Sequence, residues 1–136
     1  MKIWYQHGSE HSANLVMIGR FEDATEAAKA KEIIDALTEQ VAKDQENGTL
    51  VLGTPPNQYG NEMLDLLVRL NVASIGPAEL EQFAYEVDIE VEGKSVVVTT
   101  EELDIAVFLK ILILRGARIE VYSAHDYPDT AHGRGK

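Results

Sequence analysis

The sequence contains no cysteine, and this absence limits the chemistry available to the chain. A disulfide framework, thiolate catalysis and zinc sites built on cysteine ligands are all excluded. With 136 residues, of which 45% are hydrophobic, the chain is long enough to fold around a core of its own. We therefore expect one domain, held together by core packing, over residues 1–124, followed by a polar C-terminal tail over residues 125–136.

Long apolar runs are also missing from the sequence. The longest run, Ile105 to Leu114, is interrupted by Lys110 and reaches only about half of the roughly 20 residues that a membrane span requires. No signal peptide or other targeting segment is visible near Met1. We therefore expect a cytoplasmic protein that does not enter the membrane.

Basic residues are scarce. The 12 lysines and arginines stand against 23 aspartates and glutamates, which gives a formal net charge of −11. Such a charge repels phosphate backbones and anionic membranes over long range and keeps a protein in solution. Direct nucleic-acid binding is therefore disfavoured.

The periodicity of the apolar residues predicts both strands and helices. The clearest strand pattern covers Phe83 to Val91, where apolar and acidic residues alternate as they do in an antiparallel sheet with one wet face. Asp23 with Glu26, and Thr99 with Glu102, have the spacing of capping boxes at helix starts. The predicted elements are strand 15–21, helix 24–44, helix 61–70, strand 83–91, strand 95–99, helix 100–115 and strand 117–123, with two more strands at 3–6 and 49–53.

This order of elements predicts an α+β fold. Two strand–helix units around an antiparallel sheet, with the helices packed on one face, form a ferredoxin-like sandwich. The strand at 3–6 would be an extra N-terminal strand, and the helix at 61–70 an inserted one. The segment 103–114 is apolar on nearly every side, so either the segment 49–82 or a second subunit must cover it. Because two-fold dimers are the commonest oligomers, we expect a homodimer.

The histidines are confined to two segments, each of which follows a predicted strand. Imidazoles and carboxylates in proximity provide acid–base groups or metal ligands. We expect the two segments to lie at the same end of the sheet and to form the functional site. The candidate binding residues are His7, Ser9, Glu10, His11, Tyr122, His125 and Asp126. The candidate metal ligands are His7, His11 and His125, with a divalent ion such as zinc as the cofactor.

Two segments match the letters of known motifs, but the predicted structure around each does not fit the motif. The letters from His7 to His11 match the inverted zinc-protease motif, but Gly8 and the flanking strands do not allow the helix on which that motif depends. The run Gly93-Lys94-Ser95 ends like a phosphate-binding loop, but it joins two predicted strands rather than a strand and a helix. We reject both motifs.

Three functions remain open. The first is a small binding or regulatory protein, a homodimer that engages a protein or a small molecule. The second is a small metal-assisted or acid–base hydrolase, in which His7 and His125 share proton transfer and Glu10 or Asp126 orients one of them. The third is an acidic mimic of nucleic acid, for which the row Glu86, Asp88 and Glu90 would imitate phosphates. The common reading of such a row is a solvated sheet face that discourages aggregation. The sequence leaves open whether the chain is an enzyme.

Overall fold

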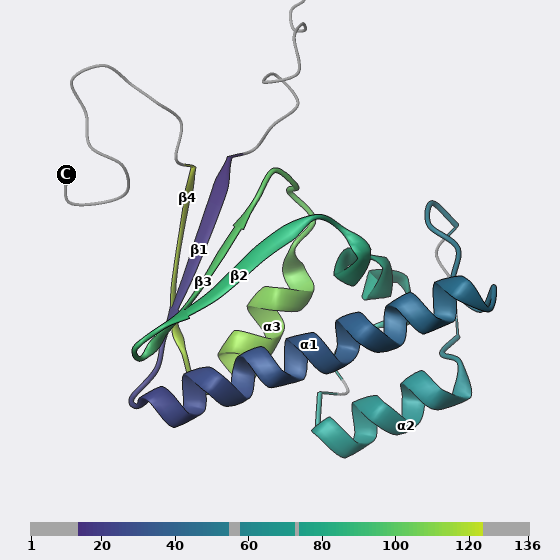
Figure 1. Ribbon diagram of the computed structural model, residues 1–136, viewed down its shortest axis with the longest axis horizontal. Helices are drawn as coiled ribbons and strands as arrows, with labels where there is room; N and C mark the ends of the chain where they lie inside the picture. The colour runs from purple at the N-terminus through teal and green to yellow at the C-terminus, as the bar shows by residue number, and fades with distance from the viewer. Residues whose placement is uncertain (1–13, 55–57, 73, 124–136) are drawn as a thin grey trace, which may run out of the picture.

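The computed structural model describes residues 14–54, 58–72 and 74–123, and shows an α+β domain in which helices pack on a four-stranded antiparallel sheet (Figure 1). The predicted strand at 3–6 lies outside these residues. The elements in chain order are β1 (Leu15–Arg20), α1 (Ala24–Glu46), α2 (Asn61–Leu70), the 3₁₀ helix η2 (Pro77–Ala84), β2 (Val87–Glu92), β3 (Ser95–Thr100), α3 (Ala106–Leu114) and β4 (Arg118–Ser123).

The strands lie in the order β2-β3-β1-β4, and each neighbouring pair is antiparallel. β3 and β1 are therefore the central strands, and β2 and β4 are the edges. The chain passes from β1 to β2 through α1, α2 and η2, and from β3 to β4 through α3. The helix predicted at 61–70 is confirmed as α2, and its C-cap residue, Asn71, is in the left-handed conformation.

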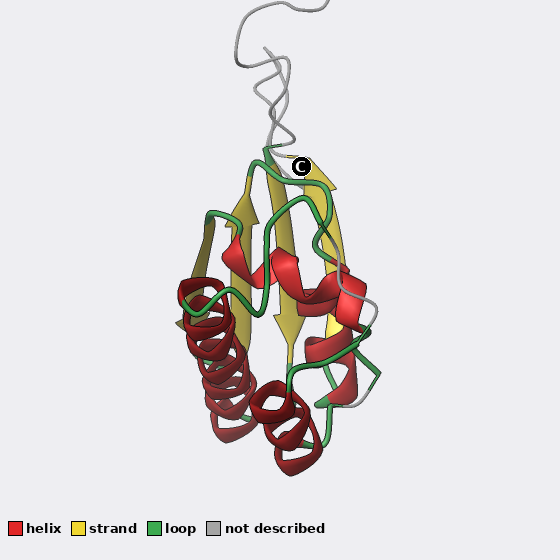
Figure 2. Ribbon diagram, turned by 90° about the vertical axis from the view of Figure 1, so that its right-hand side faces the viewer, coloured by secondary structure: helices red, strands yellow, loops and turns green. Residues whose placement is uncertain are grey.

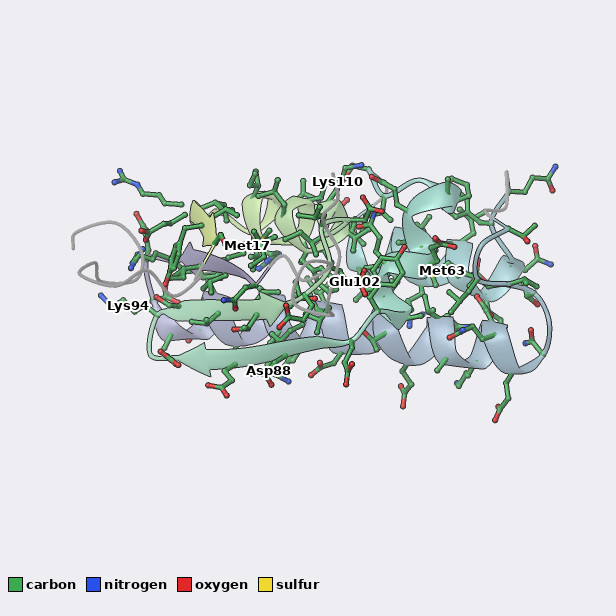
Figure 3. All side chains as sticks on the ribbon, turned by 90° about the horizontal axis from the view of Figure 1, so that it is seen from above. Met17, Met63, Asp88, Lys94, Glu102 and Lys110 are labelled. Atoms are coloured by element: carbon green, nitrogen blue, oxygen red, sulfur yellow. The ribbon has the colours of Figure 1, made fainter. Side chains whose placement is uncertain are left out.

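One face of the sheet is covered by helices and the other is not (Figure 2). On the covered face, Met17, Val96 and Val98 are at most 1% exposed, and Met17 lies between the sheet and the helices in Figure 3. Gly19 allows α3 to approach β1 closely, because a Cβ at this position would lie 3.1 Å from a methyl group of Leu112. We call the other side the open face.

Helix α1 begins where the sequence predicted. The carboxylate of Asp23 accepts a hydrogen bond from the Glu26 amide at 3.0 Å and caps the helix. Glu26 does not complete a capping box, since its own carboxylate accepts a hydrogen bond from Arg115. The helix ends at Asn47, followed by Gly48 with a positive φ of 84°, which a glycine adopts without strain.

The predicted strand 83–91 is wrong in its first half. Phe83 belongs to η2 and packs edge-to-face on Phe108, with 5.5 Å between the ring centroids. The strand begins at Val87, and the predicted alternation is confirmed over its first half, whereas Val91 near its end is 37% exposed. Val87 and Ile89 pack against the core, while Asp88 lies exposed between them.

The second predicted capping box is also wrong. β3 continues through Thr100, and α3 begins only at Ala106. The Thr100 hydroxyl donates to the carbonyl of Glu86 and accepts from the Glu102 amide, so it closes a turn rather than starting a helix. The first turn of α3 is capped from η2, because the side-chain oxygen of Gln82 accepts a hydrogen bond from the Val107 amide at 3.0 Å.

The segment between α1 and α2 does not form the predicted strand 49–53. Only an isolated bridge joins Val51 to Thr54, and Val51 and Leu52 are about half exposed, although Leu50 is buried. Of the two expected covers of α3, the segment 49–82 provides part through η2, which starts in it and extends to Ala84, while cover by a second subunit stays a prediction. η2 packs on α3 through Phe83, while Ile113 and Leu114 near the C-terminal end of α3 stay exposed.

Candidate functional site

Most of the histidine-rich site predicted from the sequence lies outside the described residues. The residues concerned are His7, Ser9, Glu10, His11, His125 and Asp126. Tyr122 lies on β4, where it is half-buried and pairs with Val16 on β1. In the same ladder Leu15, at the start of β1, pairs with Ser123, at the end of β4. The start of β1 and the end of β4 therefore lie next to each other at one end of the sheet.

The open face has an apolar centre. The pairing registers place alternate residues of the four strands in three rows across it. In the order of the strands in the sheet, the rows are Asp88, Thr99, Val16, Tyr122; then Glu90, Val97, Ile18, Glu120; then Glu92, Ser95, Arg20, Arg118. Val16, Ile18 and Val97 occupy the middle of this face and are only partly shielded from solvent. Aliphatic side chains on β1 and β3 thus form the centre of a surface that no described element covers.

Charged side chains surround this apolar centre in an asymmetric way. Along the β2 edge, Asp88, Glu90 and Glu92 are all exposed, and Asp88 projects from the domain in Figure 3. At the opposite corner of the sheet, Arg118 stands on the other edge strand, β4, and Arg20 lies beside it on the central strand β1. Arg20 donates a hydrogen bond to Glu120 at 2.8 Å, with its own side chain 55% exposed. The open face therefore has an acidic edge and a basic corner.

Carboxylates gather at the end of the sheet where β2 starts and β3 stops. A cavity of about 410 Å³ there is lined by residues that include Glu86, Asp88, Glu101 and Glu102. Glu101 accepts a hydrogen bond from the Asn14 amide at 3.1 Å, just before β1. Within residues 14–54, 58–72 and 74–123 these groups do not come together in any cluster of three that could hold a metal ion.

The strongest polar network in the described part of the chain fastens η2 to α3. The ammonium group of Lys110 donates to both carboxylate oxygens of Glu79, at 2.7 and 2.9 Å, and to the carbonyl of Ser74 at 3.0 Å. Burial alone would raise the pKa of Glu79, but the hydrogen bonds from Lys110 and the Gly76 amide, with the charge of Lys110, outweigh burial and lower it.

Tyr85 forms a second contact beside this network. Its hydroxyl donates to Glu81 at 3.0 Å, and burial, followed by this hydrogen bond and the charge of Glu81, raises the pKa of Tyr85 to about 12. A phenol with so high a pKa remains protonated at neutral pH, so the hydroxyl of Tyr85 keeps the proton that it donates to Glu81. The contact is therefore structural.

Sequence reasoning missed a basic cavity on the helical side of the domain. Lys29 of α1, Arg69 of α2 and Arg115 at the end of α3 line a space of about 520 Å³ together with Glu32, Ile33 and Leu70. These residues come from three elements that are far apart in the sequence, so no local motif signals them.

Comparisons with known proteins complete the description. None of the described helices is long and apolar enough to cross a membrane. No curated protein matches the chain, and no solved structure matches it. A family model described as a family of unknown function (DUF6375) matches residues 1–134. Because this match spans nearly the whole sequence, the chain belongs to the DUF6375 family.

Proposed function

We propose that this chain is a small binding or regulatory protein that acts as a homodimer, and that the open face of its sheet is the surface through which two copies associate. The observation that carries the proposal is the group of aliphatic residues in the middle of a face that no described element covers: Val16, Ile18 and Val97. Apolar patches rimmed by polar side chains mark interaction sites on soluble proteins.

The charges around the patch favour a second copy as the occupant. A two-fold axis parallel to the strands would place the β2 edge of one copy over the β4 edge of the other. Glu92 and Arg118 stand at opposite ends of the same row of the register, so this arrangement brings Glu92 opposite the partner's Arg118. An axis across the strands would instead place the acidic β2 edges over one another. The same arrangement brings Glu90 opposite the partner's Glu120, whose carboxylate is already paired with Arg20, so the charge match rests on Glu92 and Arg118.

The proposal includes a ferredoxin-like topology. Its support is the strand order β2-β3-β1-β4 together with two strand–helix–strand units, β1-α1-β2 and β3-α3-β4. In this topology α2 and η2 are an insertion after α1, and the strand expected at 3–6 would be an addition before β1. Because the same architecture serves unrelated functions, the dimer proposal depends on the residues of the open face and not on the topology. The cytoplasmic location expected from the sequence stays a prediction.

The mass of the particle in solution tests the dimer. We expect light scattering to give twice the 15.0 kDa of one chain. Ile18→Glu places a charge in the middle of the open face and should weaken association about tenfold or more, because it desolvates an unpaired carboxylate in the interface. Val68→Glu is the matched control, since Val68 lies on α2 with 66% exposure. A wild-type particle of 15.0 kDa at high micromolar concentration refutes the dimer.

A charge exchange tests the orientation of the two copies. Arg118→Glu should weaken the dimer, because it sets two carboxylates against each other, and Glu92→Arg should weaken it by opposing two guanidinium groups. The double variant restores opposite charges and should recover most of the affinity. Dissociation constants from sedimentation would show this recovery. Two losses that simply add would mean that Glu92 and Arg118 do not meet across the interface.

A metal-assisted or acid–base hydrolase is the second candidate, and one observation favours it. Leu15 and Ser123 pair in the β1–β4 ladder, so the chain leads toward His11 and toward His125 from neighbouring points of the sheet. Segments that start side by side can bring imidazoles and carboxylates together, and a nearby carboxylate raises the pKa of a histidine.

NMR titration of the histidines, with and without zinc, tests this second candidate. We expect His7, His11 and His125 to titrate above the ordinary value of about 6.5 and to shift when zinc is added. His7→Ala should remove the effect of zinc on His125 if both bind one ion. If the three histidines titrate at the ordinary value and do not respond to zinc, the hydrolase candidate is refuted.

A further inference from the structure

We propose that the basic cavity formed by Lys29, Arg69 and Arg115 binds a small organic anion, a phosphate or carboxylate that carries an apolar group. The cavity holds about 520 Å³, which lies within the usual range of roughly 300 to 1,000 Å³ for small-molecule sites. It lies among the helices and not on the open face, so the proposal stands independently of the dimer.

The cavity concentrates positive charge in a strongly acidic protein. Its lining brings together three of the chain's 12 basic residues, although the net charge is −11. Glu26 offsets part of this charge, because its carboxylate contacts Arg115 at 2.7 Å and Lys29 at 3.9 Å. Glu32, in the lining itself, offsets another part. Three cations against two carboxylates leave one positive charge in excess.

Helix ends explain why each arginine is present but not why the two converge. Arg69 lies in the last turn of α2, and Arg115 is the C-cap residue of α3. Cations are favoured at both places, because the C-terminal end of a helix carries partial negative charge. Yet the two helix ends meet the same stretch of α1, which presents Lys29 and, one turn later on the same side, Ile33. Two helix ends and one helix side thus place three cations around one space.

Two of these cations have unused hydrogen-bonding capacity. Arg69 makes no ion pair with any residue in the described part of the chain. Arg115 donates to Glu26 through one terminal nitrogen, while its Nε is buried and meets no acceptor among the described residues. A guanidinium group binds a phosphate or carboxylate best through two parallel hydrogen bonds. An anion in the cavity would give both arginines the acceptor that they lack.

The remaining lining defines the rest of the ligand. Ile33 is 8% exposed and Leu70 is partly buried against the core, so both present aliphatic surface to the cavity. An inorganic ion would leave this surface unused, whereas an apolar group attached to the anion would cover it. The ligand class is therefore an organic anion rather than a free ion.

Phosphate titrations followed by NMR test the charged part of the site. We expect inorganic phosphate to shift the amide resonances around Lys29, Leu70 and Arg115, and added salt to weaken the effect. Arg69→Gln should weaken binding roughly tenfold, because it removes a charge-assisted hydrogen bond. Lys43→Gln is the matched control. Lys43 lies on α1 fourteen residues after Lys29 of the cavity, which places it about 21 Å from Lys29 along the helix.

Two further variants make the test sharper. Glu32→Gln removes a negative charge from the lining and should tighten phosphate binding about threefold, a change in the opposite direction to that of the arginine variants. Arg115→Lys keeps the charge but not the planar pair of donors and should bind more weakly than wild type. If Arg115→Lys weakens folding through its bond to Glu26, the Arg69 and Glu32 variants still decide the outcome.

Phenyl phosphate, with phenol as the uncharged control, tests the apolar part of the site. Phenyl phosphate should bind more tightly than inorganic phosphate, and phenol should not bind. Equal affinities for the two phosphates would overturn the organic class of the ligand. No resonance shift at millimolar phosphate, or equal binding by wild type, Arg69→Gln and Glu32→Gln, would overturn the site itself.

Discussion

Three consecutive valines on β3 provide a sharp test of which face of the sheet is covered. Val96 and Val98 are 0% exposed and face the helices, while Val97 between them lies on the open face and is only partly buried. The same substitution at three adjacent positions keeps the residue type, the strand and the lost volume constant. Valine to alanine at each position therefore compares the two environments directly.

The expected loss in the free energy of unfolding follows from the groups that each substitution removes. Each substitution deletes the equivalent of two methylene groups, worth about 1.6 kcal/mol when both are fully buried. The cavity that remains in a packed core adds to this, so we expect Val96→Ala and Val98→Ala to cost about 2 to 3 kcal/mol each. Val97 already contacts solvent and leaves no closed cavity, so Val97→Ala should cost less than about 1 kcal/mol.

Urea unfolding followed by far-UV circular dichroism measures these differences as shifts of the transition midpoint. Because association stabilises the folded state more at higher protein concentration, the comparison is made at the lowest concentration that gives a signal and repeated at a high one. We expect the loss of stability in Val97→Ala to grow with protein concentration, because this residue lies on the proposed interface, and the loss in Val98→Ala to stay constant. If Val97→Ala costs as much as Val98→Ala at low concentration, the open face is covered within one chain and the assignment of faces is wrong.

Two other predictions concern the contacts between η2 and α3. The lowered pKa of Glu79 means that its pairing with Lys110 contributes stability above the ordinary value of 4.5 and loses it as the pH falls through the lower pKa of the folded state. Urea midpoints from pH 7 down to about pH 3 should therefore fall less steeply in Lys110→Met than in wild type, and parallel curves would contradict this. Gln82→Ala removes the acceptor from the first turn of α3 and should cost about 1 kcal/mol, whereas Gln82→Glu keeps an acceptor and should cost less; equal losses in calorimetry would show that the cap contributes nothing.

The sequence predicts elements well where one local pattern dominates. α2 matches its predicted range because Met63, Leu66 and Leu67 form a single buried face and Asn71 ends the helix in the left-handed conformation. The face of β2 that packs toward the helices is also predicted correctly at Val87 and Ile89, since apolar and acidic residues alternate there with a period of two. In both cases the burial pattern along the chain agrees with the local propensity.

The sequence fails where a contact from elsewhere decides the local structure. Phe83 fits the alternation of the following strand, but it also stands three residues after Leu80, and both side chains are buried as one face of η2. Thr99 and Glu102 have the spacing of a helix start, yet the cap of α3 comes from Gln82, 25 residues before the amide that it binds. A helix start that depends on such a distant acceptor leaves no local signature.

The basic cavity and the histidine segments also differ in how far the sequence predicts them. The basic cavity is not predictable from spacing, because Lys29, Arg69 and Arg115 converge only through the packing of α1, α2 and α3. The histidine segments stand out by composition, but they lie outside the described residues. The structure shows only that the strands next to them in the sequence pair at Leu15 and Ser123, so the site stays a prediction.

The open face did leave a signal in the sequence. The edge strand β2 alternates between apolar and acidic residues, as expected for a strand with one wet side. The central strands do not alternate, since Leu15–Arg20 reads LVMIGR and Ser95–Thr100 reads SVVVTT. Val16 and Ile18 flank Met17, and Val97 lies between Val96 and Val98, so both faces of these central strands carry aliphatic side chains. The described helices cover only one of these faces, and the second copy that we propose would account for the aliphatic residues on the other.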